Sequence, residues 1–93
     1  MTIFYILVNI KTANGFVSIG KFYVGNDKKF AAALFDQMKG TAELDEKEIL
    51  TMELMETRND LPFNLQIIAC SLEELTQNCR LIIRETFKYF NLE

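Results

Sequence analysis

The chain has 93 residues, of which 49% are hydrophobic, and its 10 basic and 13 acidic residues give a net charge of −3. This length predicts a single domain over residues 1–93 with one modest core, and the high apolar content excludes intrinsic disorder. The acidic balance argues against nucleic acid as a partner, because binding to phosphates needs a basic surface.

The first apolar run, residues 3–10, bears on localisation. It is interrupted by Asn9, follows no basic segment and is far too short to cross a membrane. We therefore expect neither a secretory signal nor a membrane span. Two cysteines without disulfide-rich spacing, Cys70 and Cys79, are typical of a reducing compartment, so the expected localisation is cytoplasmic.

Residues 3–24 predict a β-hairpin, because Asn14-Gly15 between apolar runs favours a type I′ turn. Pairing Ala13 with Phe16 places five apolar side chains on one face: Ile3, Tyr5, Leu7, Phe22 and Val24. The opposite face carries another apolar set: Phe4, Ile6, Val8, Ile19 and Tyr23. Antiparallel strands normally have one polar face. The first strand is therefore best placed in the interior of the sheet, and something must cover both of its faces.

A helix is predicted over residues 27–39, with Asn26 or Asp27 as its cap and Gly40 beyond its end. Its apolar side consists of Phe30, Ala31, Leu34, Phe35 and Met38. An acidic connection over residues 41–47 leads to a second hairpin, whose strands span residues 48–57 and 63–70. These strands alternate between apolar and polar side chains, and residues 58–62 between them are typical of a turn.

Ser71 and Glu74 predict a capping box at the start of a second helix, which runs from residue 72 to about residue 90. Its predicted core stripe consists of Leu72, Leu75, Cys79, Ile82, Ile83, Phe87 and Phe90. Leu81 is expected to point nearly opposite to this stripe.

The order strand-strand-helix occurs twice, which predicts an α+β fold. We expect a two-layer sandwich of order β-β-α-β-β-α, in which a four-stranded sheet carries both helices on one face. If each helix packs back on the sheet, the second and third strands run in the same direction.

Candidate catalytic and metal-binding residues are sparse. Histidine is absent, which removes the commonest general acid–base and metal ligand. The Cα atoms of Cys70 and Cys79 should lie about 12 Å apart, whereas a disulfide needs Cα atoms within about 7 Å. We therefore expect both cysteines to be buried structural thiols, with a redox role as the alternative. No carboxylate pair stands in a polar cluster, and no phosphate-binding glycine loop follows a strand. The sequence predicts no enzyme, no cofactor and no metal site.

Two polar features remain. Arg80, Arg84 and Lys88 form a ridge at positions i, i+4 and i+8 of the second helix. This ridge is either a solvated face that complements the negative end of the helix, or a site for an anion or an acidic partner, such as residues 43–48 of another subunit. Asn78 could orient a ligand or, more simply, hydrogen-bond to a loop carbonyl.

The apolar face that the first hairpin leaves outward predicts a small homo-oligomeric interaction or scaffold module, most simply a homodimer. The expected interface is Ile3, Tyr5, Leu7, Phe22 and Val24, and the opposite set of the hairpin is the alternative outward face. A different protein is a second candidate partner. The alternative function is small-ligand binding in an apolar pocket between sheet and helices, lined by Phe and Met side chains and gated by Asn78 or Tyr23.

Overall fold

The computed structural model describes residues 2–44 and 47–91. Its elements are β1 Ile3–Thr12, β2 Gly15–Gly25, α1 Lys28–Asp36, β3 Leu50–Arg58, β4 Leu61–Cys70 and α2 Leu72–Asn91. The four strands form one antiparallel sheet in the order β2-β1-β3-β4. A four-stranded sheet with two helices confirms the predicted α+β class.

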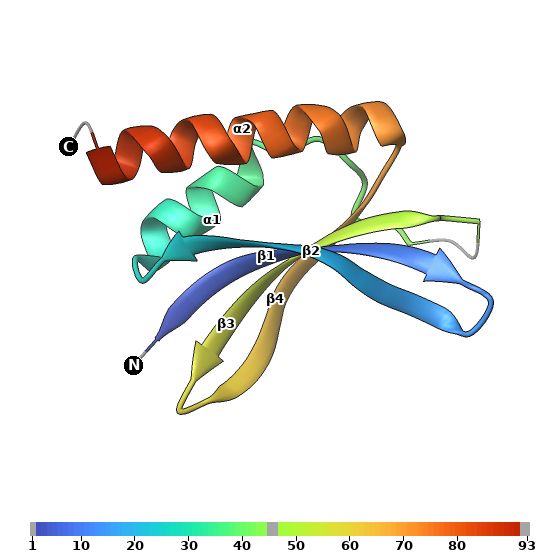
Figure 1. The fold of residues 1–93 in the computed structure, drawn as a ribbon, viewed down its shortest axis with the longest axis horizontal. Coiled ribbons are helices and arrows are strands. Elements are labelled where there is room, and N and C mark those ends of the chain that lie inside the picture. The colour runs from blue at the N-terminus through green and yellow to red at the C-terminus, as the bar shows by residue number, and fades with distance from the viewer. Residues whose placement is uncertain (1, 45–46, 92–93) are drawn as a thin grey trace.

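β1 occupies an interior position in the sheet, as its two apolar faces predicted. It pairs antiparallel with β2 on one side and with β3 on the other, so β2 and β3 run in the same direction. Figure 1 shows α1 and α2 above the sheet, with α2 along the long axis of the molecule.

The turn of the first hairpin differs from the predicted type I′ turn at Asn14-Gly15. Thr12 pairs with Gly15, so the two residues between them form the turn, and Gly15 follows with a φ of 112°. This is the pattern of a hairpin with a G1 bulge. Among the described residues, Asn59 and Asp60 are the two non-glycine residues with positive φ, and they form the type I′ turn between β3 and β4.

The register of β2 against β1 also differs from the prediction, because β2 contains two bulges. The register shifts leave Ile19 and Val24 without partners of their own in β1. Between the two bulges, Ile6 pairs with Phe22 rather than with Tyr23. One inserted residue inverts the faces of the strand that follows it.

The predicted outward placement of Phe22 and Val24 is therefore wrong. Val24 is fully buried in the core, and Phe22 packs against the core from the same side. Ile3, Tyr5 and Leu7 are left on the sheet face away from the core, which we call the outer face.

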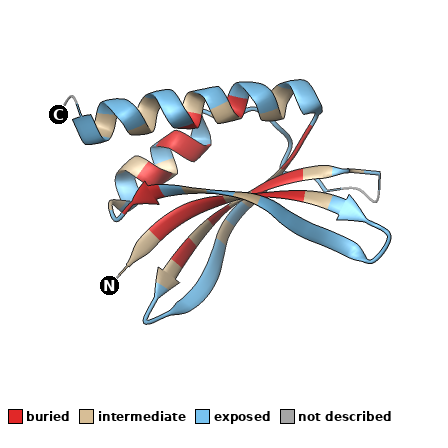
Figure 2. Ribbon diagram, in the orientation of Figure 1, coloured by how far each residue is buried: buried red, intermediate tan, exposed pale blue. Residues whose placement is uncertain are grey.

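A single core joins side chains of both helices to side chains of the sheet. Figure 2 shows the buried residues of α1 beside the buried end of β2 and the buried part of β1. The core consists of Phe4, Ile6, Val8, Val24, Ala31, Leu34, Phe35, Met52, Leu54, Cys70 and Ile82. Phe30 and Met38 pack against this cluster, so the predicted apolar side of the first helix is confirmed.

α1 ends at Asp36 rather than at the predicted Lys39. At its start, the Asp27 carboxylate accepts hydrogen bonds from two backbone N–H groups of the first turn, at 2.9 and 3.5 Å. Beyond its end, the Asn78 side chain accepts from the Lys39 N–H at 2.7 Å and donates to the Lys39 carbonyl at 2.8 Å. These tertiary hydrogen bonds replace those of a longer helix. They confirm the simpler interpretation of Asn78, a hydrogen bond to a loop carbonyl.

α2 begins with the predicted capping box. The Ser71 hydroxyl oxygen accepts from the Glu74 N–H at 3.1 Å, and the Glu74 carboxylate accepts from the Ser71 N–H at 2.9 Å. Both bonds satisfy N–H groups that a helix start leaves without a partner.

The predicted core stripe of α2 is largely wrong. The buried residues of α2 are Asn78 and Ile82, and Leu75 and Leu81 of the same helix pack against the core. Four members of the predicted stripe are exposed: Leu72, Ile83, Phe87 and Phe90. Apolar side chains occupy more than half of the circumference of α2 at 100° per residue. The pattern alone therefore did not determine which of them face the sheet.

Candidate functional site

A groove of about 250 Å³ lies between β2 and the C-terminal half of α2. We call it the β2–α2 groove, and its apolar walls are Phe22, Tyr23, Ile83, Phe87 and Phe90. Four of these residues are about half exposed: Tyr23 by 56%, Ile83 by 61%, Phe87 by 58% and Phe90 by 49%. Contiguous exposed apolar side chains of this kind mark interaction or ligand sites.

The groove wall on α2 is a row at helical spacing, because Ile83, Phe87 and Phe90 are separated by four and three residues. The Phe90 ring stacks on Tyr23 of β2, with ring centroids 6.2 Å apart and an interplanar angle of 2°. Sequence reasoning assigned the α2 row to the core. The signal that could have found it is the wide apolar arc of α2, which one sheet face cannot cover.

Tyr89 fixes this half of α2 to the start of α1. Its ring stacks on Phe30 with centroids 4.0 Å apart, and its hydroxyl donates to the Asp27 carboxylate at 2.9 Å. That hydrogen bond is the main reason why the pKa of Asp27 lies below its ordinary value. Because Asp27 also caps α1, one carboxylate holds both helices and the groove wall has a fixed support.

Thr86 also lines the groove, but its hydroxyl oxygen is buried. Among the described residues, Thr86 Oγ1 is the one buried side-chain nitrogen or oxygen without a hydrogen-bond partner. A buried polar group without a partner costs about 1–3 kcal/mol.

The groove runs beside an edge of the sheet, because β2 has a neighbouring strand on one side. An edge strand presents a row of backbone N–H and C=O groups to a further strand. Phe16, Val17 and Ile19 of β2 are exposed apolar residues, and Lys21 is its one charged residue. β2 therefore has little of the charge and none of the proline that protect sheet edges.

The opposite edge, β4, is better protected. Pro62 near its start has no N–H to donate. At its other end, Thr41 and Ala69 exchange backbone hydrogen bonds of 2.9 and 2.8 Å. Residues 45 and 46, which belong to the predicted acidic connection, lie outside the described residues.

The outer face holds three of the five residues predicted for the interface. Ile3 and Leu7 are half-buried there. Tyr5 is only 9% exposed, and the Lys21 ammonium lies 4.3 Å from the centre of its ring. The three residues therefore expose little of their apolar surface.

A polar network occupies the middle of the outer face. The Asn9 amide donates to Glu53 at 2.7 Å and to Thr51 at 3.2 Å, and its oxygen accepts from Ser18 at 2.8 Å. Asn64 donates to the second carboxylate oxygen of Glu53 at 2.6 Å. The outer face is therefore not the continuous apolar surface that the predicted register implied.

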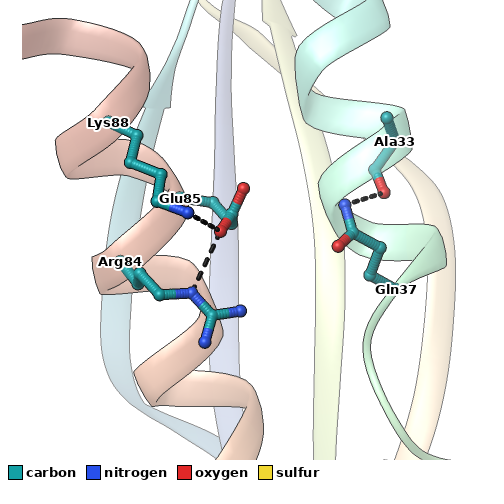
Figure 3. Close-up of polar contacts among 5 residues, drawn as sticks. All are labelled: Ala33, Gln37, Arg84, Glu85 and Lys88. Carbon is teal, nitrogen blue, oxygen red and sulfur yellow. Dashed lines mark hydrogen bonds and ion pairs between the residues drawn. The ribbon is translucent and has the colours of Figure 1, made fainter. Parts of the chain in front are cut away.

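Two residues of the predicted basic ridge, Arg84 and Lys88, form ion pairs with Glu85, and the third, Arg80, does not. Figure 3 shows Arg84 and Lys88 directed at the same carboxylate oxygen of Glu85, at 3.0 and 3.5 Å. The hydrogen bond from Arg84 is the main cause of the lowered pKa of Glu85. Arg80 has no such partner among the described residues, and together with Arg84 it lines a pocket between α1 and α2.

Both cysteines are free. Cys70 is buried with its sulfur 3.5 Å from the Lys39 carbonyl oxygen, and burial raises its pKa to about 11. Desolvation also raises the pKa of the half-buried Cys79. Thiols that stay protonated at neutral pH are poor nucleophiles and poor metal ligands. This favours the structural role expected for both cysteines.

Residues 2–44 and 47–91 contain neither a cluster of metal ligands nor a helix that could span a membrane. No group of three or more His, Cys, Asp or Glu side chains in this part of the chain is placed to hold a metal ion. Neither α1 nor α2, as described, combines the length and the hydropathy of a membrane span.

No protein-family model matches the chain, and neither a curated protein nor a solved structure matches it. The class of protein is therefore defined by fold and surface alone. It is an α+β domain with an apolar groove beside an exposed sheet edge.

Proposed function

We propose that the chain is a small homodimeric interaction module of the cytoplasm and that two copies associate through their β2–α2 grooves. The observation that carries the proposal is the exposed row Ile83, Phe87 and Phe90 beside the β2 edge. In this proposal the module is a two-layer sandwich with both helices on one sheet face. The free cysteines suit a reducing compartment.

A two-fold axis beside β2 would use the groove and the edge together. Antiparallel pairing of β2 with the same strand of a second copy would extend the sheet. The same rotation would bring the two α2 helices together over the new strand pair. Such a contact uses one surface twice, as two-fold interfaces do.

The apolar area of the groove is sufficient for the centre of a dimer interface. An aromatic side chain buries about 200 Å² when fully covered. Tyr23, Phe87 and Phe90 are half exposed, so with Ile83 the groove offers about 400 Å² per copy. A standard interface buries about 800 Å² per partner, so the β2 edge would supply the remainder. Covering the groove on both copies contributes on the order of 20 kcal/mol, against about 4–15 kcal/mol of association cost.

The mass of the full chain in solution tests the proposal. Light scattering at micromolar concentration should give twice the chain mass of 10.8 kDa. Ile83→Glu should give a folded monomer, because it places a charge in the apolar interface. Ile49→Glu is the matched control, since Ile49 is 59% exposed, Ile83 is 61% exposed, and Ile49 does not line the groove. A monomeric wild-type chain, or a dimer that survives Ile83→Glu, would refute the proposed interface.

Binding of a small apolar ligand in the groove is the alternative. It is favoured by the apolar walls of the groove. Of the two predicted gates, Tyr23 lines the groove, whereas the Asn78 amide is occupied by the Lys39 backbone. Native mass spectrometry separates the two functions. Extra mass retained on a monomer indicates the ligand binder, and a dimer without extra mass indicates the module.

A further inference from the structure

A second concave site lies on the other flank of α2, where the end of α1 meets it. This pocket has a volume of about 330 Å³, and we call it the α1–α2 pocket. Its polar lining residues are Gln37, Lys39, Gln77, Asn78, Arg80 and Arg84. At 100° per residue, Gln77, Asn78 and Arg84 lie at least about 60° around α2 from every residue of the row that forms the β2–α2 groove, whereas Arg80 lies next to Phe87.

The lining is strongly cationic. It contains three basic side chains and, among the described lining residues, no carboxylate, although acidic residues outnumber basic ones in the chain. Within the described residues, the side chains of Lys39 and Arg80 have no hydrogen-bond or ion-pair partner. Their charges are therefore available to an anion.

Arg80 and Arg84 stand one helical turn apart on α2. Like charges at this spacing destabilise a helix, and an anion bound between them would convert the repulsion into attraction. Glu85 holds only the Nε of Arg84, at 3.0 Å. Figure 3 shows the terminal nitrogens of this guanidinium directed away from Glu85, so they are available to a ligand.

The pocket is held in shape by hydrogen bonds that need no ligand. Asn78, which is 1% exposed, accepts from the Lys39 N–H at 2.7 Å and donates to the Lys39 carbonyl at 2.8 Å. The Gln37 amide donates to the Ala33 carbonyl at 3.3 Å, as Figure 3 shows. The chain that carries Lys39 is thus fixed against α2, and such preorganisation lowers the ordering cost of binding.

We propose that the α1–α2 pocket binds a phosphate dianion, either free or as the terminal group of a small phosphorylated molecule. Guanidinium groups present paired N–H donors in a fixed fork that matches phosphate oxygens. Lys39 adds a third charge, and the amide of Gln77 adds a neutral donor. The volume is near the lower end of the range for small-molecule sites, about 300–1,000 Å³. This favours a compact ligand over an extended acidic segment such as residues 43–48 of another copy.

Calorimetric titration of the full chain with inorganic phosphate and with adenosine monophosphate tests this site. Saturable binding is expected, with an affinity that falls as salt is added. A tighter Kd for adenosine monophosphate identifies a phosphorylated molecule as the ligand, and an equal or tighter Kd for inorganic phosphate identifies the free ion. Arg80→Gln should weaken both by about tenfold or more, the loss of one charge-assisted contact.

Lys28→Gln is the control, because it removes the same charge from an exposed residue that does not line the pocket. It should leave the Kd within about twofold, and near-ultraviolet circular dichroism shows that each variant is folded. The absence of saturable binding to both probes would overturn the proposal, as would equal weakening by Lys28→Gln. Binding of a peptide with the sequence of residues 41–48, with no binding of either phosphate probe, would also overturn it. These outcomes do not depend on whether the chain is a dimer.

Discussion

Replacing Asn78 with Ala tests whether one side chain ends α1 and ties it to α2. Asn78 is 1% exposed and makes two hydrogen bonds to the Lys39 backbone. Losing each costs about 0.5–1.5 kcal/mol, and the small cavity left behind adds about 1 kcal/mol. The better helix propensity of Ala offsets about 0.5 kcal/mol. The free energy of unfolding should therefore fall by about 2–3 kcal/mol, which lowers the Tm of a domain of this size by roughly 10–20 °C.

Urea unfolding followed by circular dichroism measures this loss. Gln77→Ala is the control, because Gln77 is exposed on the neighbouring position of α2 and should change the stability by less than about 0.5 kcal/mol. Hydrogen exchange of the Lys39 N–H gives a local readout, since its protection should be lost in Asn78→Ala. Equal costs for the two variants, or a Lys39 N–H that stays protected, would show that Asn78 does not hold the end of α1.

Three further predictions concern the helices. Ser71→Ala should lower the free energy of unfolding by about 1 kcal/mol in urea titrations, and no loss would mean that the capping box is not formed. Ile82→Ala should cost about 2–5 kcal/mol, well above Ile49→Ala, because Ile82 is 1% exposed and Ile49, which does not line the groove, is 59% exposed; similar costs would contradict the assigned face of α2. Tyr89→Phe should raise the pKa of Asp27 toward its ordinary value. Because the folded pKa lies below the unfolded one, near about 3.9, Asp27 adds stability above that value that is lost as the pH falls through the folded pKa. An NMR titration should give a higher pKa for Asp27 in the variant, so the variant should lose less stability at acid pH. An unchanged Asp27 pKa would argue against the hydrogen bond.

Features with a chemistry of their own could be predicted from the sequence. Ser71 and Glu74 satisfy each other's backbone N–H groups, so the start of α2 depends on four consecutive residues. The apolar side of α1 follows from helical spacing alone. The interior position of β1 follows from its lack of a polar face, which an edge strand would normally have.

The remaining features depend on contacts between elements. Ile19 and Val24 look like ordinary strand residues, and nothing local shows that each is an inserted residue of a bulge. Missing these bulges placed Phe22 on the wrong face. The end of α1 is set by Asn78, 39 residues further along the chain than Lys39. The sequence could predict that α2 leaves apolar side chains exposed, because it has more of them than one face can bury. The position of the groove could not be predicted, because it depends on how α2 packs against β2.

β1 lies between β2, which follows it directly in the sequence, and β3, which is far from it in the sequence. This position has a consequence for folding kinetics. The β1–β2 and β3–β4 hairpins are local and can form within about 1–10 μs. The β1–β3 ladder instead joins residues such as Asn9 and Thr51, which are 42 positions apart. The chain between β1 and β3 must lose conformational entropy before the β1–β3 contacts can form. Docking of the two hairpins should therefore limit the folding rate. Met52→Ala, within this ladder, should then slow folding, whereas Tyr89→Phe should mainly speed unfolding.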